Sequence, residues 1–161
     1  MLKFKPTLSA PVIAPVLTSD YGPRILNVVQ QFHDGIDIVN AGQNVSDRLN
    51  PVNTQVFAIA PGIVCYDFDK YDDRFRFDLQ GHKEDSAGNM VIIDSEIEGI
   101  KYFIRYLHLI KNTVMQGDII KTGQNIGDYA DVGFSYGAHT HIDVFLHDWS
   151  KKIDPKSVFC V

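Results

Sequence analysis

The chain has 161 residues, of which 45% are hydrophobic, and this is sufficient for a compact domain with a buried core. Its formal net charge of -5 and isoelectric point near 5.6 exclude the usual nucleic-acid-binding protein, which relies on clustered Lys and Arg. The length leaves no room for a second domain, so we expect a single domain over residues 1–161 with a core at about 18–158.

The amino-terminal residues predict neither a signal peptide nor a membrane anchor. Lys3 and Lys5 imitate the positive start of a signal peptide, but prolines at positions 6, 11 and 15 interrupt the apolar stretch that follows. No segment approaches the roughly 18 apolar residues of a transmembrane helix.

The first motif with chemical content is His33-Asp34-Gly35-Ile36-Asp37. In an extended strand, residues four apart are separated by roughly 13 Å, which is too far for His33 and Asp37 to share an ion. A helix is disfavoured by Gly35 and by the β-branched residues around it. The chain must therefore bend, and we expect Gly35 to be the hinge because of its backbone freedom.

Most of the remaining chain is typical of short strands and turns, with little helical periodicity. Pro61-Gly62 predicts a hairpin turn, and glycines at 117, 123 and 127 separate short β segments. Residues 102–109 read as a strand that ends near His108. The fold class predicted from these patterns is mainly β.

Two stretches, 41–53 and 65–87, are rich in polar and charged residues. Within the second, residues 67–78 alternate aromatic and charged side chains, which predicts a surface hairpin or, alternatively, a wall of a substrate groove. Their carboxylates lack the spacing of a calcium loop. We expect His82 and His147 to be surface or supporting residues. Cys65 and Cys160 lie outside every metal motif and are expected to be free thiols, although a single bridge stays open.

The strongest clue is the His-x-His pair at 139 and 141, inside the alternating run 137–145. Thr140, Ile142 and Val144 would face the core, and His139, His141 and Asp143 would face solvent or a cleft. Either histidine motif alone could arise by chance.

Taken together, the two motifs predict a transition-metal site. Two histidines and one carboxylate are the ligand set of a catalytic zinc site, which keeps one position for water. Imidazole favours zinc over magnesium or calcium, which prefer oxygen ligands, while other transition metals stay open.

Six segments in order resemble the lysostaphin-type, or LytM-like, zinc metallopeptidases, which cut peptide cross-links of bacterial peptidoglycan. They are residues 18–24, 33–37, 57–64, 88–94, 106–109 and 117–127, and His139-Thr140-His141 closes the pattern. The resemblance implies an antiparallel β-sheet with a zinc groove walled by loops. Residues 41–53 and 65–87 are longer than the usual family pattern and are therefore expected to be insertions.

The resemblance also implies roles for five residues. His33, Asp37 and His141 would hold one Zn²⁺ per chain, while His108 and His139 would stand beside the ion as catalytic groups. Because the sequence has no His-Glu-x-x-His, a histidine must replace the glutamate base of helical zinc proteases. Which of the two accepts the proton is left open.

The chain departs from the family pattern at three positions, with Ala138 for proline, Thr140 for leucine and Asp143 for glutamate. Asp143 shares a strand face with the histidines, so its shorter side chain bears on their orientation.

The implied partner is bacterial peptidoglycan, reached outside the cytoplasm by phage delivery, processing or another export route. A non-catalytic binding or activating relative and a zinc peptidase acting on a non-wall peptide are the alternatives.

Overall fold

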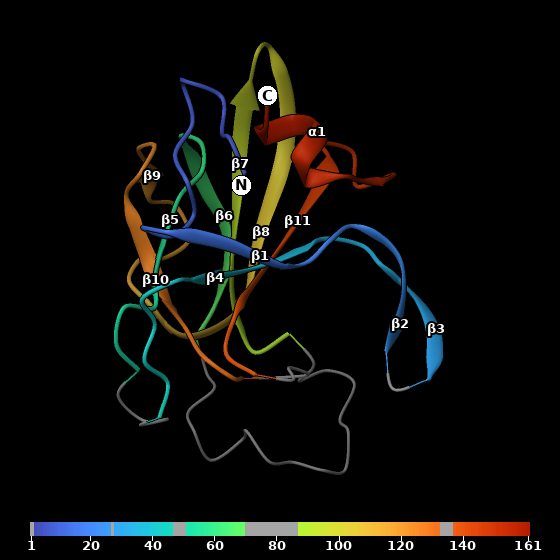
Figure 1. The fold of residues 1–161 in the computed structure, drawn as a ribbon. Coiled ribbons are helices and arrows are strands. Elements are labelled where there is room, and N and C mark those ends of the chain that lie inside the picture. The colour runs from blue at the N-terminus through green and yellow to red at the C-terminus, as the bar shows by residue number, and fades with distance from the viewer. Residues whose placement is uncertain (1, 27, 47–50, 70–86, 133–136) are drawn as a thin grey trace.

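The structure is a computed structural model that describes residues 2–26, 28–46, 51–69, 87–132 and 137–161. The strands are β1 Pro15–Ser19, β2 Gly22–Leu26, β3 Val29–His33, β4 Ile36–Asn40, β5 Gln55–Phe57, β6 Gly62–Phe68, β7 Asn89–Ile97, β8 Ile100–Asn112, β9 Ile119–Ile120, β10 Asn125–Tyr129, β11 Thr140–Leu146 and β12 Lys152–Ile153. A short helix, α1 (Pro155–Phe159), follows β12 near the carboxyl terminus (Figure 1).

Ten of these strands form one antiparallel sheet. Its main order is β1-β4-β11-β8-β7-β6-β9, with β10 paired to β8 and β5, and β12 paired to β11. The predicted class, a mainly antiparallel β fold, is confirmed. β8 is the longest strand and pairs with both β7 and β11, so it forms the centre of the sheet.

The two faces of the central strands differ because side chains alternate along a strand. Ile104 and Tyr106 of β8 lie in the hydrophobic core, as does Ile142 of β11. The Tyr106 hydroxyl accepts a 2.9 Å hydrogen bond from the backbone N–H of Ile59, so its polar end is satisfied inside the core. The opposite face is therefore the one available for polar chemistry.

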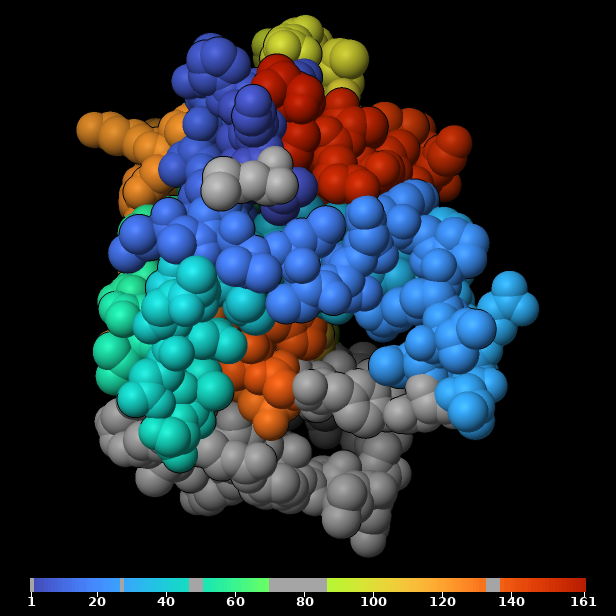
Figure 2. Space-filling view, in the orientation of Figure 1, coloured from blue at the N-terminus to red at the C-terminus, as the bar shows by residue number. Residues whose placement is uncertain are grey.

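A separate two-stranded ribbon, β2–β3, projects from the side of the molecule (Figures 1 and 2). It carries exposed apolar side chains, including Ile25, Val29 and Phe32, and Phe32 meets Tyr21 edge-to-face at 5.2 Å. Since His33 is the last residue of β3, this ribbon leads directly into the first histidine motif.

One sequence expectation is wrong: Pro61-Gly62 does not make a hairpin. β5 pairs with β10, whereas β6 pairs with β7 and β9, so residues 58–61 connect strands that have different partners. Gly62 is needed for space, because a Cβ there would lie 2.2 Å from the carbonyl oxygen of Asp94. The turn signal therefore reflected close packing of two strands.

The two stretches expected to be insertions fall partly outside the described residues. Asn44 and Val52 form an isolated antiparallel bridge across the first stretch. Most of the predicted hairpin at 67–78, together with His82, lies outside the described residues. Cys65 and Cys160 are free and half-buried, as the sequence favoured. Within the described residues, no helix is long and apolar enough to cross a membrane.

Replacing Gly62 with alanine tests the close packing of β6 on β7. We expect Gly62→Ala to lower the free energy of unfolding by about 1–3 kcal/mol, because the added methyl group must displace backbone. Gly42→Ala is the matched control, since its Cβ would meet nothing closer than 3.7 Å, and it should change stability by less than about 0.5 kcal/mol. Urea denaturation compares them, and equal effects would contradict this packing.

Candidate functional site

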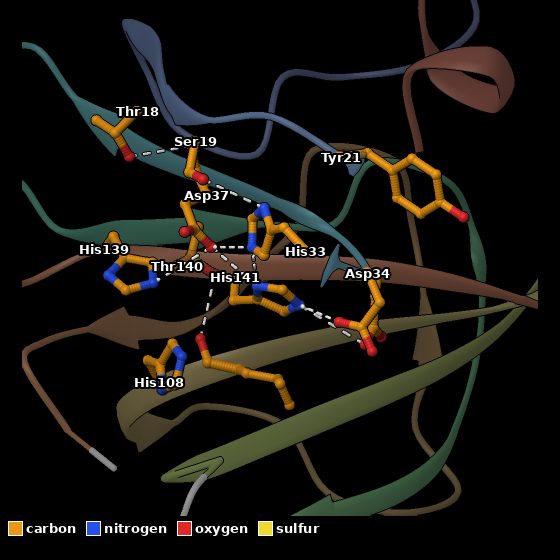
Figure 3. Close-up of polar contacts among 12 residues, drawn as sticks. Thr18, Ser19, Tyr21, His33, Asp34, Asp37, His108, His139, Thr140 and His141 are labelled. Carbon is orange, nitrogen blue, oxygen red and sulfur yellow. Dashed lines mark hydrogen bonds and ion pairs between the residues drawn. The ribbon is translucent and has the colours of Figure 1, made fainter. Parts of the chain in front are cut away.

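Sheet register brings the two histidine motifs together. β4 pairs with β11 so that Asp37 lies opposite His141, and His33 is returned over them by the bend between β3 and β4. His33 Nε2 lies 3.1 Å from Asp37 Oδ1 and 3.1 Å from His141 Nδ1, and His141 Nδ1 lies 2.8 Å from Asp37 Oδ1 (Figure 3). All three residues are buried, so these atoms form a cluster that could hold a metal ion.

The expected bend is present, but Gly35 serves it for a different reason than backbone freedom. Gly35 does not have a positive φ angle. A Cβ at this position would lie 2.5 Å from His141 Nε2 and 2.5 Å from the carbonyl oxygen of Ile142. Glycine is therefore required because β11 and the His141 ring pass directly against the bend.

The hydrogen bonds of His33 fix which nitrogen faces the cluster. Its Nδ1 lies 2.7 Å from the backbone carbonyl oxygen of Asp20, which can only accept, so Nδ1 carries the proton. Nε2 then presents a lone pair to Asp37 Oδ1. Two acceptor atoms at 3.1 Å repel each other unless a proton or cation lies between them.

Asp37 is kept ionised. Although burial opposes the charge, contacts with the rings of His139, His141 and His33 hold the pKa of Asp37 far below its usual range. Its other oxygen, Oδ2, lies 3.3 Å from Arg24 Nη1, which also donates to Ser19 at 2.8 Å. Asp37 thus offers Oδ1 to the cluster while Arg24 occupies Oδ2.

The outer nitrogen of His141 faces carboxylates. Nε2 lies 3.7 Å from both Asp143 Oδ2 and Asp34 Oδ1. Burial disfavours the charged ring, but the nearby carboxylates of Asp143 and Asp37 outweigh burial and raise the pKa of His141. The arrangement resembles the carboxylate–histidine pairs that orient metal ligands.

The expectation that Asp143 looks into solvent or a cleft is wrong. Its side chain is fully buried and accepts hydrogen bonds from Arg105 Nε at 2.9 Å and Nη2 at 2.5 Å. Lys152 Nζ lies 2.9 Å from Oδ2. Despite burial, the contacts with His141 and Arg105 hold the pKa of Asp143 well below its usual range. Alternation along β11 placed this residue on the correct face but could not show what covers it.

His108 lies beside the cluster because of an irregularity in β8. Asn89 pairs with Leu109 and Val91 with Tyr106, so β8 contains one extra residue in this interval. His108 adopts a φ of 60°, a left-handed conformation that is costly for a residue with a side chain. β-Bulges commonly redirect side chains next to functional sites.

The protonation of His108 follows from its surroundings. Nδ1 lies 2.8 Å from the carbonyl oxygen of Val132, so Nδ1 carries the proton and Nε2 a lone pair. Burial, with smaller contributions from the neighbouring His139 and His141, lowers the pKa of His108 to about 3. The ring is therefore neutral at neutral pH.

His139 completes the group. Its Nδ1 lies 2.8 Å from the carbonyl oxygen of Gly137, and its Nε2 lies 3.4 Å from Asp37 Oδ1. The rings of His139 and His108 meet edge-to-face with centroids 4.8 Å apart. All five histidine and aspartate residues that the sequence singled out thus gather at one place (Figure 3).

These side chains line an open groove with a volume of about 630 Å³. One wall comes from the β2–β3 ribbon through Ile25, Leu26 and Phe32, while Leu107 and Ala87 line it from β8 and from the residues before β7. The groove therefore combines a polar centre with apolar walls, as sites for peptide-like ligands do.

Sequence reasoning missed the supporting cations. Arg24 belongs to the segment 18–24 that carries the resemblance, yet nothing in its spacing indicated contact with Asp37. Arg105 and Lys152 lie in the β8 and β12 partners of β11, and only strand pairing reveals them. His147 lies elsewhere, bonded to Asp94 at 2.9 Å and stacked on Phe103, as expected for a surface histidine.

Several known proteins are similar to this chain. The profile of Peptidase family M23 matches residues 31–155. The peptidoglycan DD-endopeptidase ShyA of Vibrio cholerae is 28% identical over 130 residues, covering 81% of this chain and 25% of that protein.

Two solved structures share the fold. The catalytic domain of the prophage-encoded M23 protein EnpA from Enterococcus faecalis, a single-residue mutant, has a TM-score of 0.63 at 25% identity and covers 95% of each chain. The catalytic domain of lysostaphin from Staphylococcus simulans has a TM-score of 0.61 at 25% identity over 88% of this chain and 90% of that one. The chain spans less than a third of the length of two curated relatives that it matches, at 31% and 25%.

The buried Asp143–Arg105 pair can be tested by its pH dependence. Arg105→Met should lower the free energy of unfolding by about 2–4 kcal/mol at neutral pH, because a buried carboxylate loses two charge-assisted hydrogen bonds. Since the pKa of Asp143 is lowered by folding, its contribution is present above the unfolded pKa of about 4 and is lost as the pH falls. The difference between variant and wild type should therefore narrow below about pH 4.

Urea denaturation over this pH range makes the measurement. Adding Asp143→Leu to Arg105→Met should recover part of the loss at neutral pH, because no buried charge is then left uncompensated. An Arg105→Met deficit that is independent of pH would contradict the assignment.

Proposed function

The chain belongs to peptidase family M23, and from this premise we propose that it is a zinc endopeptidase that hydrolyses peptide cross-links or stem peptides of bacterial peptidoglycan. The observation that carries the proposal is the convergence of His33 Nε2, Asp37 Oδ1 and His141 Nδ1 within 2.8–3.1 Å of one another. The His33 Nε2 lone pair and the Asp37 carboxylate both face the centre of this cluster, and a cation would satisfy them together, whereas without one only a proton on His141 Nδ1 can lie among the three atoms.

The donor set fits zinc. Two imidazole nitrogens and one carboxylate oxygen match a catalytic zinc site, whereas magnesium and calcium would require mostly oxygen. The surroundings support the same reading, because His33 donates its Nδ1 proton to the carbonyl oxygen of Asp20 and His141 turns Nε2 toward carboxylates. Outer contacts of this kind fix the tautomer of a ligating histidine. We assign these three residues as ligands of one ion per chain.

Zinc held there would supply Lewis acidity, which lowers the pKa of a water molecule and polarises the scissile carbonyl. The chain itself must move the protons. His108 is suited to accept one, because its Nδ1–H is fixed on Val132 and its Nε2 has no hydrogen-bond partner among the described residues. We assign His139, whose ring meets that of His108 edge-to-face, to stabilise the oxyanion or protonate the leaving amine.

The substrate class rests on the groove and on the relatives. A groove of about 630 Å³ that is open at the surface admits an extended chain. ShyA is named as a peptidoglycan endopeptidase, and lysostaphin as an antimicrobial peptidase. We therefore propose that the protein acts on the cell wall, outside the cytoplasm, and that residues 1–161 form a single peptidase domain.

Two classes of variant separate metal binding from catalysis. His141→Ala and Asp37→Ala should lose zinc and activity together. His108→Ala and His139→Ala should retain zinc, measured by metal analysis, and lower kcat by about 10²–10⁴-fold, the usual contribution of proton transfer. His147→Ala is the control and should change neither, since its ring bonds Asp94 on another part of the surface.

The assay is mass spectrometry of fragments released from purified sacculi of several cross-link types, with and without a chelator. Fragments with new amino termini that are released only without the chelator would support the proposal and identify the hydrolysed bond. Full activity of His139→Ala would contradict its role. Digestion of casein but no sacculus would move the assignment to a non-wall peptide, and bound zinc without hydrolysis would indicate a binding module.

A further inference from the structure

The carboxyl-terminal segment contacts aspartates that lie beside the two ligand histidines. β12 and α1 supply Lys152 and Lys156, four residues apart in the chain. In Figure 2 this segment, in red, lies against the light-blue residues that lead into and out of β2 and β3. Each lysine contacts an aspartate next to one histidine, and neither belongs to a motif that the sequence analysis used.

On the His141 side, Lys152 joins two carboxylates. Its Nζ contacts Asp34 and lies 2.9 Å from Asp143 Oδ2. The oxygens of both aspartates and Nε2 of His141 lie within 4.8 Å of one another. Its ammonium group lies over the ring of Phe145, with Nζ 5.1 Å from the ring centroid. Lys152 thus separates two like charges beside the outer nitrogen of His141.

On the His33 side, Lys156 holds Asp20. Nζ lies 2.6 Å from Asp20 Oδ2, and the backbone carbonyl oxygen of Asp20 accepts the Nδ1 proton of His33 at 2.7 Å. Lys156 therefore acts on the loop that orients His33. The Lys156–Asp20 pair is more exposed than the Lys152–Asp143 pair. The side chains of Lys156 and Asp20 are 32% and 49% exposed, whereas those of Lys152 and Asp143 are 23% and 0% exposed.

We propose that the carboxyl-terminal segment braces the metal site through these two lysines, and that Lys152 in particular is a positioning residue that keeps the His33–Asp37 bend against His141. This inference rests on the proposed zinc site. Without Lys152, the charges of Asp34 and Asp143 would repel each other. Asp34, whose side chain is 47% exposed, would turn toward water and loosen the bend beside His33.

For the zinc affinity of a variant that lacks Lys152, simple electrostatics and the bracing role predict opposite changes, which makes the proposal testable. Removing a positive charge near a cation site strengthens cation binding by itself. Bracing predicts weaker binding in spite of this gain. Burial also predicts that loss of Lys152 weakens zinc binding more than loss of Lys156. Exposed ion pairs contribute little to holding side chains in place, whereas an ion pair with a buried carboxylate contributes more.

The experiment measures zinc affinity by competition with a chromogenic chelator in folded variants. Lys152→Met should bind zinc about 10–100-fold more weakly, the usual effect of removing an outer contact, and Lys152→Arg should recover most of the loss. Lys156→Met should cost less than about fivefold. Lys151→Met is the matched control, because this exposed neighbour makes no ion pair among the described residues, and it should leave affinity unchanged or slightly higher.

A second readout does not require zinc. Amide hydrogen exchange at residues 33–35 of the zinc-free protein should be faster in Lys152→Met than in Lys151→Met. Unchanged or tighter zinc binding by Lys152→Met would overturn the inference. If the wild type binds no zinc, the proposed function fails, and the exchange rates alone then decide whether Lys152 braces the bend.

Discussion

Three buried polar atoms that face one another, two of them acceptors, are the constraint on which the rest of this structure depends. His33 Nε2 and Asp37 Oδ1 cannot share a proton while the His33 Nδ1 proton is held by the carbonyl oxygen of Asp20. A cation, or the proton of His141 on Nδ1, must therefore lie among these atoms. The surrounding contacts hold the repelling His33 and Asp37 acceptors close together.

The fold meets this constraint mainly through strand pairing. The β4–β11 register sets Asp37 opposite His141, and Gly35 gives the His141 ring the space that any side chain would occupy. Outside the cluster, Arg24 holds the second oxygen of Asp37, and the buried Asp143 faces the far side of His141. The extra residue in β8 then turns His108 toward the same groove. Each of these structural features helps to fix the position of one side chain of the site.

The sequence predicted the members of this site better than their environment. Alternation and spacing indicated His33, Asp37, His139 and His141 because two histidine motifs occur in one chain, although either motif alone could arise by chance. The same alternation placed Asp143 in solvent or a cleft, since it cannot show that a side chain from a neighbouring strand covers it. Pro61-Gly62 gave a false hairpin for a similar reason, because strand partners are set by distant residues. Arg24 and Lys152 carried no local signal at all.

The measurement that tests the central claim most directly is a crystal structure of the zinc-loaded protein with anomalous scattering recorded at the zinc absorption edge. The account predicts one ion, bonded to His33 Nε2, Asp37 Oδ1 and His141 Nδ1 at about 2.0–2.2 Å. An ion bound instead by Asp34 and Asp143, or no ion between the two histidine motifs, would contradict it.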